Sequence, residues 1–335
     1  MVVLLASICC ILWGSAIPAI KTGYRLLEVE SSDTASQIVF AGIRFALAGL
    51  LVLLFGTIRE KKIMLPEKSM IRYIVSVCLA QTLVQYFFFY IGVAHTSGVK
   101  GGIITGTGNF IAILMSCLVA RNEKLTGRKM IGCLLGFAGV VLINLNGSTL
   151  DMGFKLTGEG FVLISQVSYA VSTLLINRYS KKMSPVLLSG SQFFAGGILL
   201  FIIGKFMGGH LDKLTAAGAV LILYLALVSA VAYTLWSILL AHNPVSRVAI
   251  LGFVNPLCSV ILSALVLGEV QEAFNLYSLS ALVMVCVGIY AVLIQSVAFS
   301  TDIIASLWKV MGFTILLAFT LFKTGAVAHS IFHAH

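Results

Sequence analysis

Long apolar stretches separated by short polar segments make up the chain from residue 2 to residue 296. Stretches of roughly 20 apolar residues can cross a bilayer as helices, and these do not alternate as barrel strands do. The pattern predicts an all-α polytopic membrane protein with ten transmembrane helices. The spans are expected at about 2–20, 34–55, 73–93, 98–120, 127–145, 158–177, 184–203, 218–240, 244–267 and 273–296.

Apolar segments at the two ends of the chain differ from the internal spans. The opening run has neither a basic start nor a small-residue cleavage site, so we expect a retained first span rather than a signal peptide. Residues 306–322 are apolar but contain Lys309 and precede Lys323. Three alternatives stay open for this segment: an eleventh helix, a helix lying in the interface, or a disordered end.

Lysine and arginine gather in alternate loops between the predicted spans. The loops after the second, fourth and sixth spans hold twelve of them, and the opposite loops hold five. Basic loops are retained in the cytoplasm. We therefore expect a multi-pass protein of the cell membrane, embedded in the lipid bilayer, with a cytoplasmic N-terminus.

Composition supports the membrane class and excludes several others. Hydrophobic residues make up 59% of the chain and charged residues 10%, whereas soluble domains carry about 25% charged residues. The net charge of +10 comes from residues between apolar runs, so no nucleic-acid partner is expected. The seven cysteines form no CxxC pair, and the terminal histidines lack acidic or cysteine partners, so we expect neither a metal nor a cofactor.

The two halves of the chain repeat each other with a displacement of 146 residues. Val99 is followed by Asn109 and a glutamate at 123, and Val245 is followed by Asn255 and Glu269 at the same spacings. Many carriers are built from two repeats around a site near the membrane midplane. We predict a first five-helix repeat at 1–146, a second at 147–298, and an extension at 299–335. An odd number of spans per repeat requires the halves to insert upside down relative to each other.

Polar side chains inside the spans are the candidates for a solute site, because they are costly in lipid and usually face a cavity or one another. Arg44 has the highest free-energy cost in lipid, because it carries a charge within a predicted span. It either bonds to helix-end carbonyls or an acid such as Asp33 or Glu30, or it contacts an anionic substrate. For the other polar residues, helix–helix hydrogen bonding competes with cavity lining.

Several of these residues share helix faces. Gln81 and Gln85 are one turn apart, as are Tyr233 and Trp236, and residues three or four apart lie on one face. Asn109 and Asn255 are each 14 residues before their glutamate, well inside the bilayer. We predict that the cavity is lined by Trp13, Gln81, Gln85, Asn109, Tyr169, Tyr233, Trp236 and Asn255, with Arg44 as the group that neutralises a carboxylate.

Two further positions carry expectations. Lys100 begins the fourth span and is expected to reach the lipid headgroups. Gly102 and Gly106 allow close helix approach, within the monomer or between protomers. Whether the protein is a monomer or a homodimer is open.

Three motifs carry a family resemblance. They are LWGSAIPAIK at 12–21, Arg44-Phe45 in the second span, and Asn255-Pro256 followed by Leu267-Gly268-Glu269 at the ninth. Together they resemble the drug/metabolite transporter superfamily, specifically its EamA-type ten-helix members. In the first repeat Phe110 replaces the proline, so the fourth span has no proline to kink it. The resemblance implies an inner-membrane carrier, often an exporter of amino acids, related metabolites or drugs.

The sequence therefore predicts a secondary transporter of small organic solutes that works by alternating access. No P-loop, H-E-x-x-H or G-x-S-x-G motif is present, so ATP-driven transport and catalysis are not expected. Facilitated efflux and proton antiport are both open. The alternative from another class is an intramembrane enzyme acting on a lipid or isoprenoid. A channel or a scaffold is a weaker third reading.

Overall fold

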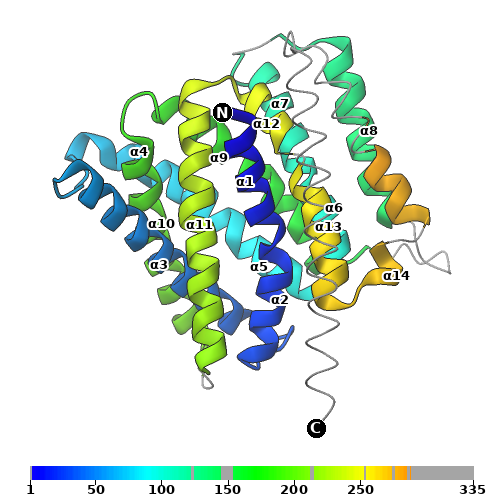
Figure 1. Ribbon diagram of the computed structural model, residues 1–335, viewed down its shortest axis with the longest axis horizontal. Coiled ribbons are helices and arrows are strands. Elements are labelled where there is room, and N and C mark those ends of the chain that lie inside the picture. Colours follow the sequence, from blue (N-terminus) through cyan, green and yellow to red (C-terminus); the bar gives the residue numbers. More distant parts are fainter. Residues whose placement is uncertain are drawn as a thin grey trace.

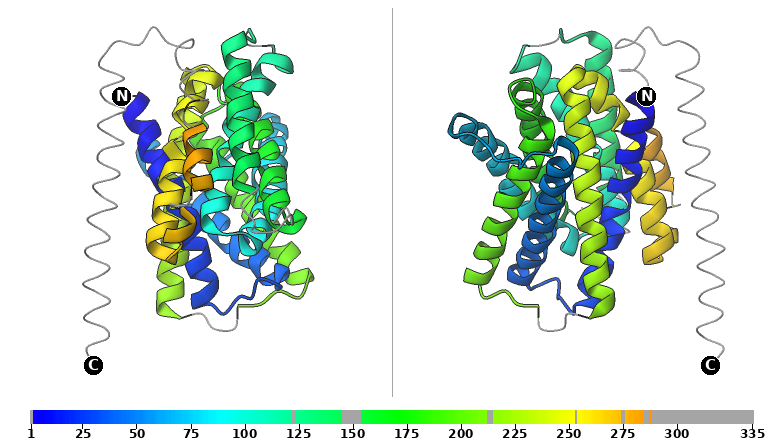
Figure 2. Two further views of the ribbon diagram at one scale, coloured as in Figure 1. Left: turned by 90° about the vertical axis from the view of Figure 1, so that its right-hand side faces the viewer. Right: turned by 60° about the vertical axis from the view of Figure 1, so that its left-hand side comes forward.

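The computed structural model describes residues 2–121, 124–144, 154–211, 215–252, 254–273, 276–284 and 287. All regular structure in these residues is helical, without a strand. The helices form one elongated bundle (Figure 1), and the side views show the long helices running next to one another along its length (Figure 2).

Many of the spans consist of more than one helical segment. In chain order the α-helices are α1 (Val2–Gly14), α2 (Ala16–Leu26), α3 (Thr34–Glu60), α4 (Ile71–Val77), α5 (Tyr86–His95), α6 (Gly98–Thr105), α7 (Thr107–Leu118), α8 (Gly127–Asn144), α9 (Phe161–Tyr179), α10 (Pro185–Phe206), α11 (Ala216–His242), α12 (Val245–Leu251), α13 (Val254–Leu267) and α14 (Val270–Ala273). A 3₁₀ turn at Lys68–Met70 precedes α4, and π-helical segments at Cys78–Gln85 and Leu156–Gly160 precede α5 and α9.

Eight helical segments of the described chain are long and apolar enough to cross a membrane. They are Val2–Leu26, Thr34–Glu60, Lys68–His95, Gly98–Leu118, Leu156–Tyr179, Pro185–Phe206, Ala216–His242 and Val245–Leu267. These match the first four predicted spans and the sixth to ninth, and α8 lies where the fifth was predicted. The all-α membrane fold is confirmed. The predicted tenth span lies largely outside the described residues, as does all of 299–335, so the count of ten stays a prediction.

The fourth and ninth spans break at equivalent glycines. Gly106 separates α6 from α7, and Gly252 directly follows α12, shortly before α13. In each break the asparagine three residues later donates its backbone N–H to the glycine carbonyl, at 3.3 Å for Asn109 and 3.1 Å for Asn255. The fourth span is therefore interrupted without a proline. The break follows the glycine that both repeats share, and places both asparagines beside it.

The second and seventh spans touch along facing stripes of glycine. Gly42 and Gly49 on α3 and Gly197 and Gly204 on α10 are each seven residues apart, which keeps them on one helix face. A Cβ added at Gly204 would lie 2.7 Å from the backbone nitrogen of Val39. Small residues let membrane helices approach this closely. The two helices cross on one side of the bundle, opposite α8 (Figure 1).

Contacts between the halves join two pairs of equivalent spans, and the first and third spans each pack against the other's counterpart. The second span packs against the seventh through α3 and α10, and the fourth against the ninth through α6 and α13. The first span packs against the eighth through α1 and α11, and the third against the sixth through α5 and α9. Gly102 meets Ser259, and Gly106 meets Pro256, so this glycine pair packs within the monomer. The repeat boundaries at 146 and 298 stay predictions.

Candidate functional site

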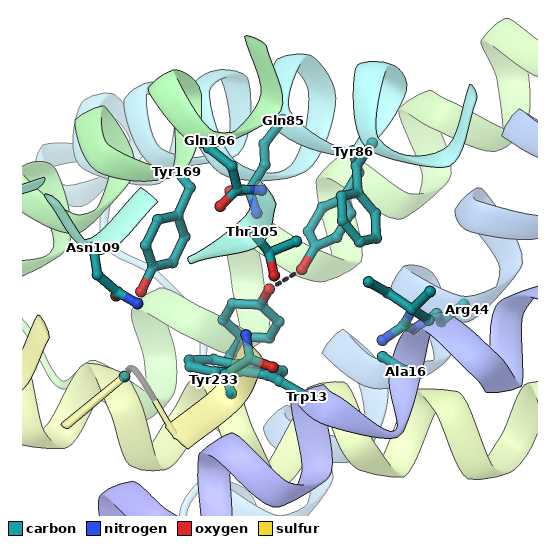
Figure 3. A pocket seen from close by; sticks show the side chains of 14 residues that line it. Trp13, Ala16, Arg44, Gln85, Tyr86, Thr105, Asn109, Gln166, Tyr169 and Tyr233 are labelled. Carbon is teal, nitrogen blue, oxygen red and sulfur yellow. Dashed lines mark hydrogen bonds between the residues drawn. The ribbon is translucent and has the colours of Figure 1, made fainter. Parts of the chain in front are cut away.

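A small cavity lies inside the bundle where the broken spans meet the long helices. Its lining residues come from both halves of the chain and are Trp13, Ala16, Ile17, Arg44, Gln85, Tyr86, Phe89, Thr105, Asn109, Gln166, Tyr169, Tyr233, Gly252 and Asn255. Their side chains converge on one space (Figure 3). Its free volume is about 60 Å³, room for a few water molecules. This is less than the roughly 300–1,000 Å³ of a usual small-molecule site.

Arg44 is a buried cation at one side of this cavity. Its side chain is 1% exposed. Nε donates to the carbonyl of Leu225 at 3.2 Å and to Ser229 Oγ at 3.0 Å, and Nη1 donates to Tyr90 Oη at 2.8 Å. Neither Asp33 nor Glu30 pairs with it, and within the described residues it has no acidic partner. The expected carbonyl bond exists, but its acceptor lies in the interior of α11 rather than at a helix end.

The second guanidinium terminal nitrogen, Nη2, makes no hydrogen bond with the described residues. A buried charge is costly unless it is paired. Apart from these hydrogen bonds, the guanidinium lies 5.1 Å from the centre of the Phe45 ring. Arg44 is therefore a buried cation without an acidic partner in the described residues, and an anionic group beside it would be stabilised.

Aromatic rings form the wall that faces Arg44. The hydroxyls of Tyr86 and Tyr233 are hydrogen-bonded to each other across the two halves of the chain (Figure 3). The ring of Trp13 lies 4.8 Å from that of Tyr233, centroid to centroid, at a tilt of 53°. Such rings offer apolar and π surface to a solute, while their polar atoms orient it.

Three buried polar atoms around the cavity have no hydrogen-bond partner in the described structure: Trp13 Nε1, Gln85 Oε1 and Asn109 Oδ1. Buried polar groups are normally bonded, so each exception needs an explanation. Asn109 also packs on the break of the ninth span, with Oδ1 2.6 Å from the position that a Cβ on Gly252 would take. One donor and two acceptors are thus free to bind a solute or water.

Two predicted residues do not line the cavity. Gln81 lies in the π-helical segment, whose wider turns remove the one-turn match with Gln85, and it accepts a hydrogen bond from Gln192 Nε2 of α10 at 2.8 Å. Trp236 is 2% exposed and packs edge-on against Trp13, with ring centroids 4.9 Å apart. Trp236 therefore lies behind a lining residue.

The other seven predicted residues do line it: Trp13, Arg44, Gln85, Asn109, Tyr169, Tyr233 and Asn255. Gln166 and Thr105 were not predicted. Gln166 lies next to the polar stripe of the sixth span and donates to Ser165 Oγ at 3.0 Å. It was identifiable as an amide inside a span, which is the signal used for Gln85.

Two glutamates hold the start of α6 at one end of the bundle. Glu269 accepts hydrogen bonds from the backbone nitrogens of Gly98 and Val99, at 3.1 and 2.9 Å. Glu159, 3% exposed, accepts from Thr96 Oγ1 at 2.8 Å and lies 3.8 Å from Lys100 Nζ. Lys100 therefore pairs with an acid, and its expected reach to the headgroups stays a prediction. Residue 123, the counterpart of Glu269, lies outside the described residues.

Residues 1–145 and 156–294 each match the EamA-like transporter family. The chain belongs to this family. The two matches fall one in each half of the sequence, and together they cover most of it. The EamA chain is therefore a multi-pass membrane transporter of the drug/metabolite transporter superfamily.

Named relatives agree with the family. The uncharacterized transporter YetK of Bacillus subtilis is 28% identical, over 76% of this chain and 78% of its own length. YvbV of the same species is 26% identical, over 88% and 92%. The uncharacterized inner membrane transporter YedA of Escherichia coli K12 is 25% identical, over 83% and 86%. All three are named as transporters, which favours a carrier over the enzyme alternative.

A solved crystal structure has the same fold as this EamA chain. The two superpose with a TM-score of 0.63 at 15% sequence identity, covering 88% of this chain and 97% of the other. At this identity the likeness extends to the fold alone.

Proposed function

We propose that this EamA transporter is a secondary carrier that exports small organic solutes bearing a carboxylate, such as amino acids and related metabolites, by alternating access. The observation that carries the proposal is Arg44, a buried cation without an acidic partner in the described structure, beside the cavity. A carboxylate can take two hydrogen bonds from one guanidinium group.

The remaining lining residues fit the rest of such a solute. The free oxygens of Gln85 and Asn109 would accept hydrogen bonds from an ammonium or hydroxyl group. Trp13 and the tyrosines would contact apolar parts. The site draws on both repeats, as expected where two repeats move against each other.

The small volume supports alternating access. Since the free volume of about 60 Å³ holds only water-sized molecules, the helices would separate to admit a solute, and in alternating access they do so on one side at a time. We place the protein in the cell membrane with a cytoplasmic N-terminus, as the loop charges favour.

The test is flux in proteoliposomes. Purified protein would be reconstituted, and uptake of a labelled amino-acid mixture and of tetraphenylphosphonium would be measured with and without a pH gradient. We expect saturable amino-acid flux that unlabelled carboxylates inhibit. Flux of the cation alone, or no saturable flux, would overturn the proposal. Flux that follows an imposed pH gradient would identify proton antiport, and flux indifferent to it would identify facilitated efflux.

A further inference from the structure

A second cavity lies nearer one end of the same helices. Its volume is about 390 Å³, within the range of small-molecule sites. The lining residues are Ser116, Asn177, Lys181, Ala241, His242, Asn243, Pro244 and Val245. It lies where α7, α9 and α11 end and α12 begins, and α12 shares its end of the bundle with the N-terminus (Figure 1).

This cavity continues the helix faces of the central one. Ser116 follows Asn109 by seven residues on α7, and Asn177 follows Tyr169 by eight on α9. Residues at these spacings share a helix face, and the steps amount to about 10–12 Å along the axes. The two cavities therefore follow one another along α7 and α9.

A closely packed layer separates the two cavities. Its side chains are Ala112, Thr173, Trp236, Leu240 and Val248, each no more than 2% exposed. They occupy the turns between the central cavity and the second one on α7, α9, α11 and α12. Because the layer is almost entirely apolar, it closes the route to polar solutes until the helices separate.

Five of the eight residues that line the second cavity are polar, and they include one lysine, Lys181, but no acid. Lys181 is exposed and forms no ion pair with the described residues. Asn177 is held in place because Nδ2 donates to the carbonyls of Leu240, at 2.7 Å, and Asn243, at 3.3 Å. This fixes its Oδ1 as an acceptor without a partner in the described structure.

We propose that this cavity is a vestibule with its own solute-binding site, in which Lys181 attracts the carboxylate before the solute crosses the apolar layer. The inference rests on the proposed function and deepens it. The vestibule binds the solute that enters from the N-terminal side, and Arg44 then binds its carboxylate in the central cavity. Asn177 Oδ1 would accept a hydrogen bond from an ammonium group on the same solute.

The test compares two adjacent lysines. Lys181→Glu reverses the charge inside the cavity, and Lys182→Glu makes the same change next to it, where Nζ lies 5.5 Å from the centre of the Tyr73 ring instead. Initial rates of labelled amino-acid transport would be measured in right-side-out and inside-out membrane vesicles. Protease access to an N-terminal tag would identify the face.

An exposed ion pair contributes up to about 1 kcal/mol, which corresponds to a change in KM of up to about five-fold. We expect Lys181→Glu to raise the KM from the N-terminal face by about two- to five-fold, with the KM from the other face unchanged. Lys182→Glu should keep the wild-type KM on both faces, and amino-acid amides should not distinguish the variants.

Two outcomes would overturn the vestibule. One is that the wild-type protein transports saturably and both variants, Lys181→Glu and Lys182→Glu, have the same KM. The other is a rise in KM on both faces. Either would leave the central site standing. If the wild-type protein shows no saturable flux at all, the proposed function fails, and the vestibule fails with it.

Discussion

Replacing Arg44 by glutamine removes the charge that, in our account, selects the solute. The variant loses the donors that contact Leu225, Ser229 and Tyr90, together with the unpartnered Nη2. Hydrogen bonds to a charged group contribute about 1.5–3 kcal/mol. A carboxylate deprived of this partner should therefore bind about ten- to hundred-fold more weakly.

Stability should change far less than affinity. The three hydrogen bonds donated by the charged guanidinium contribute about 1.5–3 kcal/mol each, but removing a buried cation also removes its desolvation cost of several kcal/mol, which offsets that loss. We expect Arg44→Gln to be expressed and to elute as a single species like the wild type. Arg72→Gln is the matched control, because Arg72 is exposed and its side chain donates a hydrogen bond to the adjacent Tyr73, away from the cavity.

The assay is the KM for amino-acid transport in proteoliposomes, measured beside inhibition by the corresponding amino-acid amides. Arg44→Gln should raise the KM for the acids by at least ten-fold and leave inhibition by the amides nearly unchanged. The reasoning is refuted if the folded variant keeps the wild-type KM, or if acids and amides weaken equally. The second result would mean that Arg44 shapes the cavity without contacting a carboxylate.

Other predictions concern helix packing and a further residue that lines the central cavity. Glu269→Gln leaves the backbone N–H of Gly98 or Val99 without an acceptor, which costs about 1–3 kcal/mol of folding free energy. The melting temperature in detergent should therefore fall, and an unchanged value would contradict this. Gly197→Leu would place a side chain against the Ala46 backbone, so the yield of folded protein should drop, whereas Gly127→Leu, which has open space, should not lower it. Gln166→Leu should raise the KM without loss of folded protein, and an unchanged KM would exclude contact with solute.

Much of the fold was predictable because membrane helices are encoded locally. A membrane helix satisfies its backbone hydrogen bonds within itself, so each apolar run of sufficient length predicts one span at its own position in the sequence. The breaks at Gly106 and Gly252 follow from the repeat, which brings Asn109 and Asn255 to the centre. Proline content alone would have indicated only the second break.

The site was predictable only in part because its details depend on partners distant in sequence. Helical periodicity assigned both Gln85 and Gln81 to the cavity. The local sequence does not predict the π-helical segment that turns Gln81 toward Gln192. Arg44 could be recognised as costly, but its acceptors on α11 become known only when the two halves are packed together. The same holds for Lys100, whose acid comes from the second half.

During transport the solute should occupy the cavity beside Arg44, and protection of a single cysteine by the solute measures this occupancy. The seven native cysteines would be replaced by alanine, and Asn255→Cys or, as a control outside the cavity, Ser191→Cys would be introduced. Labelling by a membrane-permeant thiol reagent would be timed with and without the amino-acid mixture. The account predicts that amino acids slow labelling at 255 and leave 191 unaffected, and that amides protect less. Equal labelling at 255 with and without transported solute would contradict it.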